Sequence, residues 1–143
     1  MLIGEFRHTI DAKKRLALPA KFRKELGETV IITRGLDNCL VVYTQKEWEI
    51  MSDKLGKLPS GQAEARGFAR IMLAGAMAVE LDKLGRILVP DYLKNYASLV
   101  KNVVVCGLYN RLEIWNADSW EIYRKKVEGE IGDIAGKIKE LGI

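Results

Sequence analysis

The sequence is poor in the residue types that build disulfide frameworks and metal centres. Its 143 residues include 2 cysteines, 3 prolines and 1 histidine. Cys39 and Cys106 lie in separate apolar runs, and neither has a histidine or a second cysteine nearby. We therefore expect no disulfide framework and no zinc site. This use of cysteine is typical of a protein in the reducing cytosol. The apolar runs are far shorter than a membrane span, and the residues after Met1 lack the pattern of an export signal.

The scarcity of catalytic residue types also argues against an enzyme. His8 is the only imidazole, and neither cysteine lies in a recognisable nucleophile context. Gly67 and Gly75 lie inside a helical pattern and do not follow a strand, so they do not form a phosphate-binding loop. We expect no catalytic residues, no cofactor, no metal site and no small-molecule substrate.

Apolar residues and a local excess of positive charge are what the sequence does contain. Hydrophobic residues make up 48% of the chain, which is enough for a packed core. Residues 1–27 hold seven basic and three acidic side chains, so this segment carries the whole net charge of +4. Such a basic segment is typical of a protein that binds a polyanion, although a solvated lysine-rich surface has the same composition.

The chain contains two copies of one unit. Asp11–Pro19 and Asp82–Pro90 both read D-x-x-x-R-φ-x-φ-P, where φ is an apolar residue, at an offset of 71 residues. A second block recurs in the same order at an offset of 72, and its matches are Gly35/Gly107, Leu36/Leu108, Leu40/Leu112, Tyr43/Trp115 and Trp48/Trp120. A unit of about 70 residues buries little apolar area on its own. We therefore expect the two halves to interleave around a pseudo-two-fold axis.

Both units predict a strand, a polar turn, a short strand, a short helix and a hairpin. The expected strands are 5–10, 15–18, 78–81 and 86–89, with hairpins around 34–38 and 107–110. Helices are expected after Pro19 and Pro90, at Trp48 and Trp120, over 62–76 and, with glycine breaks, over 118–141. Gly27 is expected to cap the first helix, and Tyr43, Trp48, Phe68, Trp115 and Trp120 to pack in cores and repeat interfaces. The predicted division is 1–50 for the first repeat, 51–76 for a helical connector, 77–122 for the second repeat and 123–143 for a helical tail.

The repeated unit, followed by a short basic helix, resembles the AbrB/SpoVT type of DNA-binding domain. Two copies in one chain, with Pro19–Arg23 in the first and Gly85–Pro90 in the second, resemble the MraZ family of bacterial transcriptional regulators. The resemblance implies an α+β, mainly β fold, in which two tandem swapped-hairpin half-barrels form a pseudo-two-fold β-barrel with short flanking helices. It also implies a cytoplasmic, nucleoid-associated regulator of the division and cell-wall gene cluster. Such a protein binds tandem repeats of double-stranded promoter DNA and forms a ring-shaped homo-oligomer, for example an octamer.

The expected DNA contacts lie in and around the two D-x-x-x-R turns. Arg15 and Arg86 can each donate two hydrogen bonds to guanine or phosphate, and Asp11 and Asp82 can orient them. The alternative is that each Asp–Arg pair only closes its turn as a local ion pair. Further expected DNA contacts are Lys13, Lys14, Lys83, Arg7 and Arg23.

One turn residue departs from the family pattern. The second turn has Gly85, but the first has Lys14 where the family usually has glycine. A residue with a side chain tolerates positive φ poorly, so the first turn need not have the same geometry.

Two other functions compete with a DNA-binding regulator. The first is an AbrB-like antitoxin or adaptor whose main role is to bind a partner protein, and the weakly amphipathic residues 121–143 speak against it. The second is a purely structural oligomer that does not touch nucleic acid.

Overall fold

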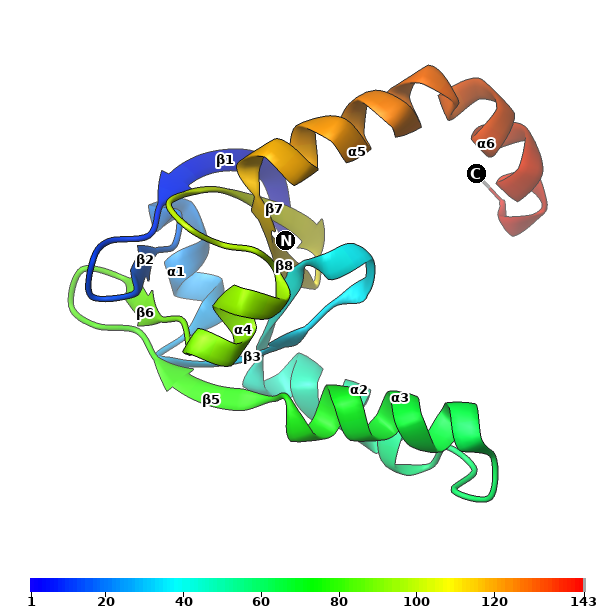
Figure 1. The fold of residues 1–143 in the computed structure, drawn as a ribbon, viewed down its shortest axis with the longest axis horizontal. Coiled ribbons are helices and arrows are strands. Elements are labelled where there is room, and N and C mark those ends of the chain that lie inside the picture. The colour runs from blue at the N-terminus through cyan, green and yellow to red at the C-terminus, as the bar shows by residue number, and fades with distance from the viewer. Residues whose placement is uncertain (143) are drawn as a thin grey trace.

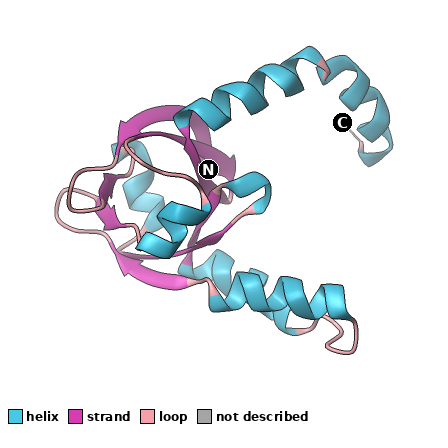
Figure 2. Cartoon of the chain, viewed as in Figure 1, coloured by secondary structure: helices cyan, strands magenta, loops and turns pink. Residues whose placement is uncertain are grey.

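The computed structural model describes residues 1–142, which form an antiparallel sheet, a short ribbon and surrounding helices (Figures 1 and 2). The strands are β1 (Leu2–Thr9), β2 (Arg15–Ala17), β3 (Thr29–Arg34), β4 (Leu40–Thr44), β5 (Met77–Glu80), β6 (Arg86–Leu88), β7 (Asn102–Tyr109) and β8 (Arg111–Asn116). The α-helices are α1 (Ala20–Leu26), α2 (Gln45–Gly56), α3 (Ala63–Ala74), α4 (Asp91–Tyr96), α5 (Ala117–Gly129) and α6 (Ile131–Ile138). Two short 3-10 helices are η1 (Leu36–Asn38) and η2 (Lys139–Leu141). The expected α+β fold class is confirmed.

The strand order of the main sheet is palindromic with respect to the two repeats. The order is β1-β7-β8-β4-β3-β5, and neighbouring strands are antiparallel. β1 of the first repeat pairs with β7 of the second, and β5 of the second repeat pairs with β3 of the first. β4 and β8 meet at the centre. Each repeat therefore contributes a strand beside the other repeat's hairpin, and the two halves interleave as expected.

A two-stranded ribbon of β2 and β6 joins the repeats a second time. Leu16 lies opposite Ile87 in this ribbon, and both side chains are buried. β1 and β5 remain the edges of the main sheet, and the isolated bridge Ile10↔Leu16 links the end of β1 to the ribbon. We find no closed barrel in the described residues 1–142, so the barrel that the resemblance implies is not confirmed.

One hydrophobic core serves both repeats. Leu18 and Phe22 from the first repeat lie in the same buried cluster as Val89 and Leu93 from the second. All four are at most 1% exposed. Because the units share this cluster, neither repeat buries its apolar side chains without the other.

Prolines and a glycine set the limits of the short helices. Pro19 and Pro90 immediately precede α1 and α4. A backbone N–H at the start of a helix has no acceptor within the helix, so a proline there costs no hydrogen bond. α1 ends before Gly27, whose φ of 78° lies in the region that favours glycine. The predicted helix starts and the predicted glycine end are confirmed.

Two helical arms extend from the sheet on the side away from the β2–β6 ribbon (Figure 1). α2 and α3 contact each other as a hairpin around the break at Pro59–Gly61, and α5 continues into α6. The helix expected over 62–76 is α3, whereas α2 already begins at Gln45. The domain limits at 50, 76 and 122 stay a prediction. In the part of the chain that the structure describes, no helix combines the length and the apolar character needed to cross a membrane.

Candidate nucleic-acid interface

The turn between β1 and β2 is closed by its aspartate. Asp11 Oδ1 accepts hydrogen bonds from the backbone N–H groups of Lys13 and Arg15, both at 2.9 Å. Asp11 Oδ2 accepts a bond of 2.8 Å from Arg15 Nε. The Lys14 N–H donates to Asp11 O at 3.0 Å, which completes the turn. One carboxylate therefore fixes both the turn backbone and the direction of Arg15.

The turn between β5 and β6 repeats this geometry. Asp82 Oδ1 accepts from the N–H groups of Leu84 at 2.9 Å and Arg86 at 2.8 Å, and Asp82 Oδ2 accepts from Arg86 Nε at 2.7 Å. Gly85 here has a φ of 72°, and Lys14 at the same place in the first turn has a φ of 64°. The first turn therefore adopts the glycine-type geometry although a lysine stands there.

The ribbon holds the two turns at one end of the molecule. The Leu18 N–H donates to Gly85 O at 3.0 Å, and the Val89 N–H donates to Lys14 O at 2.9 Å. Each turn is thus bonded to the residue that follows the short strand of the other repeat. In Figure 1 both turns lie beside β2 and β6, at the end opposite the two helical arms. The structure therefore brings the two arginine-bearing turns together.

Hydrogen bonds to the turn aspartates lower the pKa of both carboxyl groups. The largest cause is the backbone N–H of Arg15 for Asp11 and that of Arg86 for Asp82. The side chains of Arg15 and Arg86 are 31% and 27% exposed. Within residues 1–142, their Nη atoms donate no hydrogen bond. Each guanidinium therefore keeps Nη donors that no residue among 1–142 uses.

The turn lysines differ in their surroundings. Lys13 and Lys83 are exposed, and no ion pair engages either ammonium group among the described residues. Lys14 Nζ instead donates to Asp91 Oδ2 at the start of α4, at 2.8 Å. This contact lowers the pKa of Asp91. Lys14 thus forms an ion pair with Asp91 of the second repeat.

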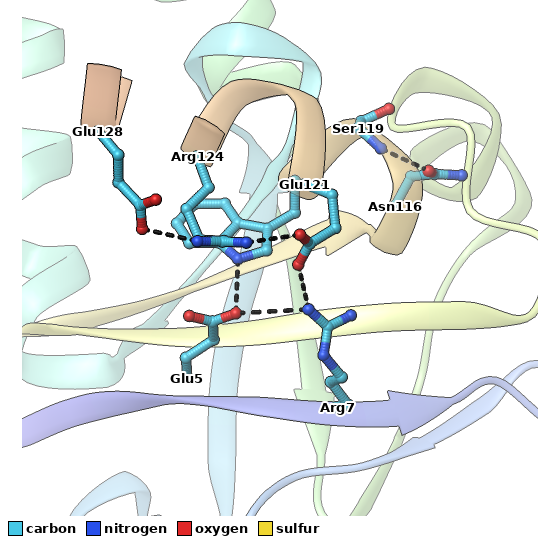
Figure 3. Close-up of polar contacts among 8 residues, drawn as sticks. Glu5, Arg7, Asn116, Ser119, Glu121, Arg124 and Glu128 are labelled. Atoms are coloured by element: carbon cyan, nitrogen blue, oxygen red, sulfur yellow. Dashed lines mark hydrogen bonds and ion pairs between the residues drawn. The ribbon is translucent and has the colours of Figure 1, made fainter. Parts of the chain in front are cut away.

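Arg7 and Arg23 each have protein partners of their own. Arg7 on β1 donates to Glu121 of α5 and lies 3.7 Å from Glu5 (Figure 3). Arg23 on α1 donates through Nε and Nη2 to Leu18 O, at 3.2 and 3.1 Å. Arg7 therefore faces α5, whereas Arg23 lies beside the ribbon.

A polar network that the sequence did not indicate fastens α5 to β1 (Figure 3). Trp120 Nε1 donates to Glu5 Oε1 at 2.7 Å, and Glu121 accepts from both Arg7 and Arg124. The i, i+3 spacing of Glu121 and Arg124 indicates a helical ion pair. No local pattern connects that pair with β1, so only the fold reveals the contact.

Cys39 and Cys106 lie in one small buried cluster with Val104 and Trp115. Within residues 1–142, no three or more His, Cys, Asp and Glu side chains are grouped so that they could hold a metal ion. Cys39 and Cys106 are free and buried. Burial raises the pKa of both thiols, for Cys106 to about 12. They behave as apolar packing groups.

Comparison with known proteins gives matches along the length of the chain. A family model described as "MraZ protein, putative antitoxin-like" matches residues 1–71 and residues 72–133. The transcriptional regulator MraZ of Natranaerobius thermophilus is 46% identical over 143 residues, which cover 100% of both chains. The transcriptional regulator MraZ of Caldicellulosiruptor saccharolyticus is 48% identical over 143 residues, which again cover 100% of both chains. That of Ligilactobacillus salivarius is 50% identical over 135 residues, 94% of each chain.

Proposed function

The chain belongs to the MraZ family, and we propose that it is a transcriptional regulator that binds double-stranded promoter DNA through its two D-x-x-x-R turns. One observation carries the proposal: two turns of the same geometry lie at one end of the molecule, each with guanidinium Nη donors that no residue among 1–142 uses. The names of the relatives, all transcriptional regulators, support it.

In this proposal the arginines select sequence and the lysines hold the DNA backbone. A guanidinium that is held through Nε offers two neighbouring Nη donors, which match guanine O6 and N7 in the major groove. Lys13, Lys14 and Lys83 contact phosphates, which adds affinity irrespective of sequence. Asp11 and Asp82 keep the arginines in a fixed direction and thereby reduce the entropy lost on binding.

The proposed targets are tandem repeats in the promoter of the division and cell-wall gene cluster, bound on the nucleoid in the cytoplasm. One chain offers two turns and few cations, so it binds weakly alone. A ring-shaped homo-oligomer places several pairs of turns along the repeats and raises the avidity where the spacing matches. The palindromic strand order supports a scaffold of AbrB-like swapped hairpins.

Fluorescence anisotropy with labelled DNA tests the proposal. The probes are a duplex from upstream of the chain's own gene and a scrambled duplex of the same composition. We expect tighter binding to the first, and a loss of about tenfold or more from Arg15→Ala combined with Arg86→Ala. Arg70→Ala removes an exposed cation on α3 and is the matched control. Equal affinity for the two duplexes, or full affinity in the double variant, would overturn the proposal.

Binding of a partner protein is a second candidate function. Residues 121–143 as a whole are only weakly amphipathic, but α6 within them has an apolar face. Ile131, Ile134 and Ile138 are spaced along one face of this helix, and Ile131 is 62% exposed. The matching family model is itself described as antitoxin-like. Deletion of residues 130–143 tests this role: a partner should no longer co-purify, while the DNA affinity stays unchanged. Co-purification that survives the deletion counts against α6 as the binding surface.

A further inference from the structure

Arg23 lies on a basic helix next to Lys24, so charge alone assigns it to the DNA backbone. We propose a different role: Arg23 is a positioning residue for the second turn and acts on DNA through Gly85 and Arg86. This inference rests on the proposed DNA-binding function of the turns. It predicts that Arg23 matters for specific binding although its guanidinium contacts no phosphate.

The orientation of the Arg23 guanidinium is fixed by a single backbone oxygen. Nε and Nη2 both donate to Leu18 O, at 3.2 and 3.1 Å. Leu18 is fully buried, so its carbonyl group is well placed to act as a rigid acceptor. Two N–H donors that share one acceptor fix the plane of the guanidinium. A lysine ammonium group is not planar and cannot provide this fixed orientation.

That guanidinium plane lies directly against the α-carbon of Gly85. A Cβ at Gly85 would lie 2.0 Å from Arg23 Nε and 2.4 Å from Arg23 Cζ, far inside van der Waals contact. Gly85 O also accepts the N–H of Leu18 at 3.0 Å. Leu18 therefore bonds to Arg23 through its C=O and to Gly85 through its N–H. The three residues form one packed unit under the second turn.

The first turn has no packed arginine, and an ion pair holds it in place of one. At the repeat offset, Lys94 of α4 corresponds to Arg23, and Lys14 corresponds to Gly85. In residues 1–142 the Lys94 side chain donates no hydrogen bond, and Lys14 is held by Asp91 at 2.8 Å. Each turn is thus held by a helix of the other repeat. Only the second turn uses a packed guanidinium for this purpose.

The consequence for DNA binding is a fixed starting direction for Arg86. Arg86 follows Gly85 directly, and its Nε is bonded to Asp82 at 2.7 Å. Without Arg23, the turn backbone loses its support and must be ordered at the moment of binding, which weakens affinity. The number of phosphates neutralised stays the same, so the salt dependence of binding does not change.

Titration of the full chain with promoter DNA at several salt concentrations separates positioning from direct contact. Arg23→Ala and Arg23→Lys are both expected to weaken specific binding about three- to tenfold, without a change in the slope of log K against log salt. A phosphate-contacting arginine would behave differently. Arg23→Lys would then keep its affinity, and Arg23→Ala would reduce the slope by about one. That pattern overturns the proposal.

A double-variant cycle tests whether Arg23 works through Arg86. In the Arg86→Ala background, Arg23→Ala should have no further effect on affinity, because the positioned group is gone. An undiminished effect in that background overturns the proposal. Circular dichroism checks that each variant is folded, and Arg23→Gln, which keeps one donor for Leu18 O, takes the place of Arg23→Ala if the latter does not fold.

Hydrogen exchange of the free protein tests the contact without DNA. Arg23→Ala should speed exchange of the Gly85 and Arg86 amides, which donate to Asp82 O at 2.9 Å and Asp82 Oδ1 at 2.8 Å. Lys94→Ala, the matched change in the other repeat, should leave these amides unaffected.

The exchange experiment also separates the two proposals. Unchanged exchange at Gly85 and Arg86 in the Arg23 variant overturns the positioning role. Equal affinity of the wild-type chain for promoter and scrambled DNA overturns the proposed function, and the exchange result then still decides whether Arg23 supports the turn.

Discussion

Lys14 and Gly85 share one backbone conformation in the two turns, with φ of 64° and 72°, although only glycine adopts it without steric cost. At the first turn, the Lys14 side chain extends to Asp91. At the second turn, Arg23 occupies the space that a side chain at Gly85 would need. The two repeats therefore satisfy the same backbone requirement in different ways.

Alanine at these two matched positions should have unequal effects on stability. Gly85→Ala places a Cβ at positive φ and against Arg23, so it should lower the free energy of unfolding by about 2–4 kcal/mol. Lys14→Ala keeps a Cβ that is already accommodated and removes only an exposed ion pair, so its effect should be much smaller. Urea unfolding followed by tryptophan fluorescence measures both. Equal losses would contradict the different packing of the two turns.

The turn aspartates should make the stability depend on acidic pH. The pKa of Asp11 and of Asp82 lies below the ordinary 3.8, mainly because of the N–H groups of Arg15 and Arg86. Such carboxylates contribute stability above their ordinary pKa, and this contribution is lost as the pH falls through the lowered pKa. Asp11→Asn with Asp82→Asn should therefore reduce stability at neutral pH and flatten its decline below about pH 4. Urea unfolding at several values between about pH 2.5 and 7 measures how the free energy of unfolding changes with pH. If this pH dependence is the same in the double variant, Asp11 and Asp82 are not its source.

His8 should add a second pH dependence, near neutrality. Burial, and then the nearby charge of Arg23, lower its pKa from the ordinary 6.5. Protonation therefore favours the unfolded chain: stability is complete above about pH 6.5 and falls as the pH drops toward the lowered pKa. His8→Gln should remove this decline in unfolding measured between about pH 5 and 7. If the decline persists in the variant, another group causes it.

The internal repeat made the outline of the fold predictable. The match of Asp11 with Asp82 indicated two copies of one turn, and the small size of each unit indicated interleaving. The strands, the helix starts after Pro19 and Pro90 and the helix end at Gly27 follow from local patterns, so the sequence alone predicts them. The turn geometry was also predictable for Gly85, where the residue type itself favours positive φ.

Contacts between distant residues could not be predicted in the same way. Arg7 and Arg23 are both basic residues that the sequence assigns to the DNA interface, and this stays a prediction. The fold also places Arg7 against Glu121 and Arg23 over Gly85, contacts that no local pattern indicates. Phe68 was expected in a core or repeat interface but is 44% exposed, because α3 lies in an arm outside the shared core.

The salt dependence of DNA binding should separate the turn lysines from Arg7. Lys13→Ala and Lys83→Ala should each reduce the slope of log K against log salt by about one, because both ammonium groups are exposed and without an acidic partner among residues 1–142. Arg7→Ala should leave the slope unchanged, since Glu121 already pairs with Arg7. Anisotropy titrations at four or more salt concentrations measure this. A slope reduced by Arg7→Ala would place β1 in the interface.

The two cysteines should be inert in the folded chain. The thiolate is the reactive form of cysteine, and burial raises the pKa of Cys39 and Cys106, for the latter to about 12. Reaction with Ellman's reagent at about pH 8 should therefore be negligible until urea unfolds the protein. Both thiols should then react together, because Cys39, just before β4, and Cys106 on β7 lie in one buried cluster and are exposed in the same transition. Early reaction at one cysteine, assigned by mass spectrometry, would instead show that the segment around it opens locally while the rest of the sheet stays folded.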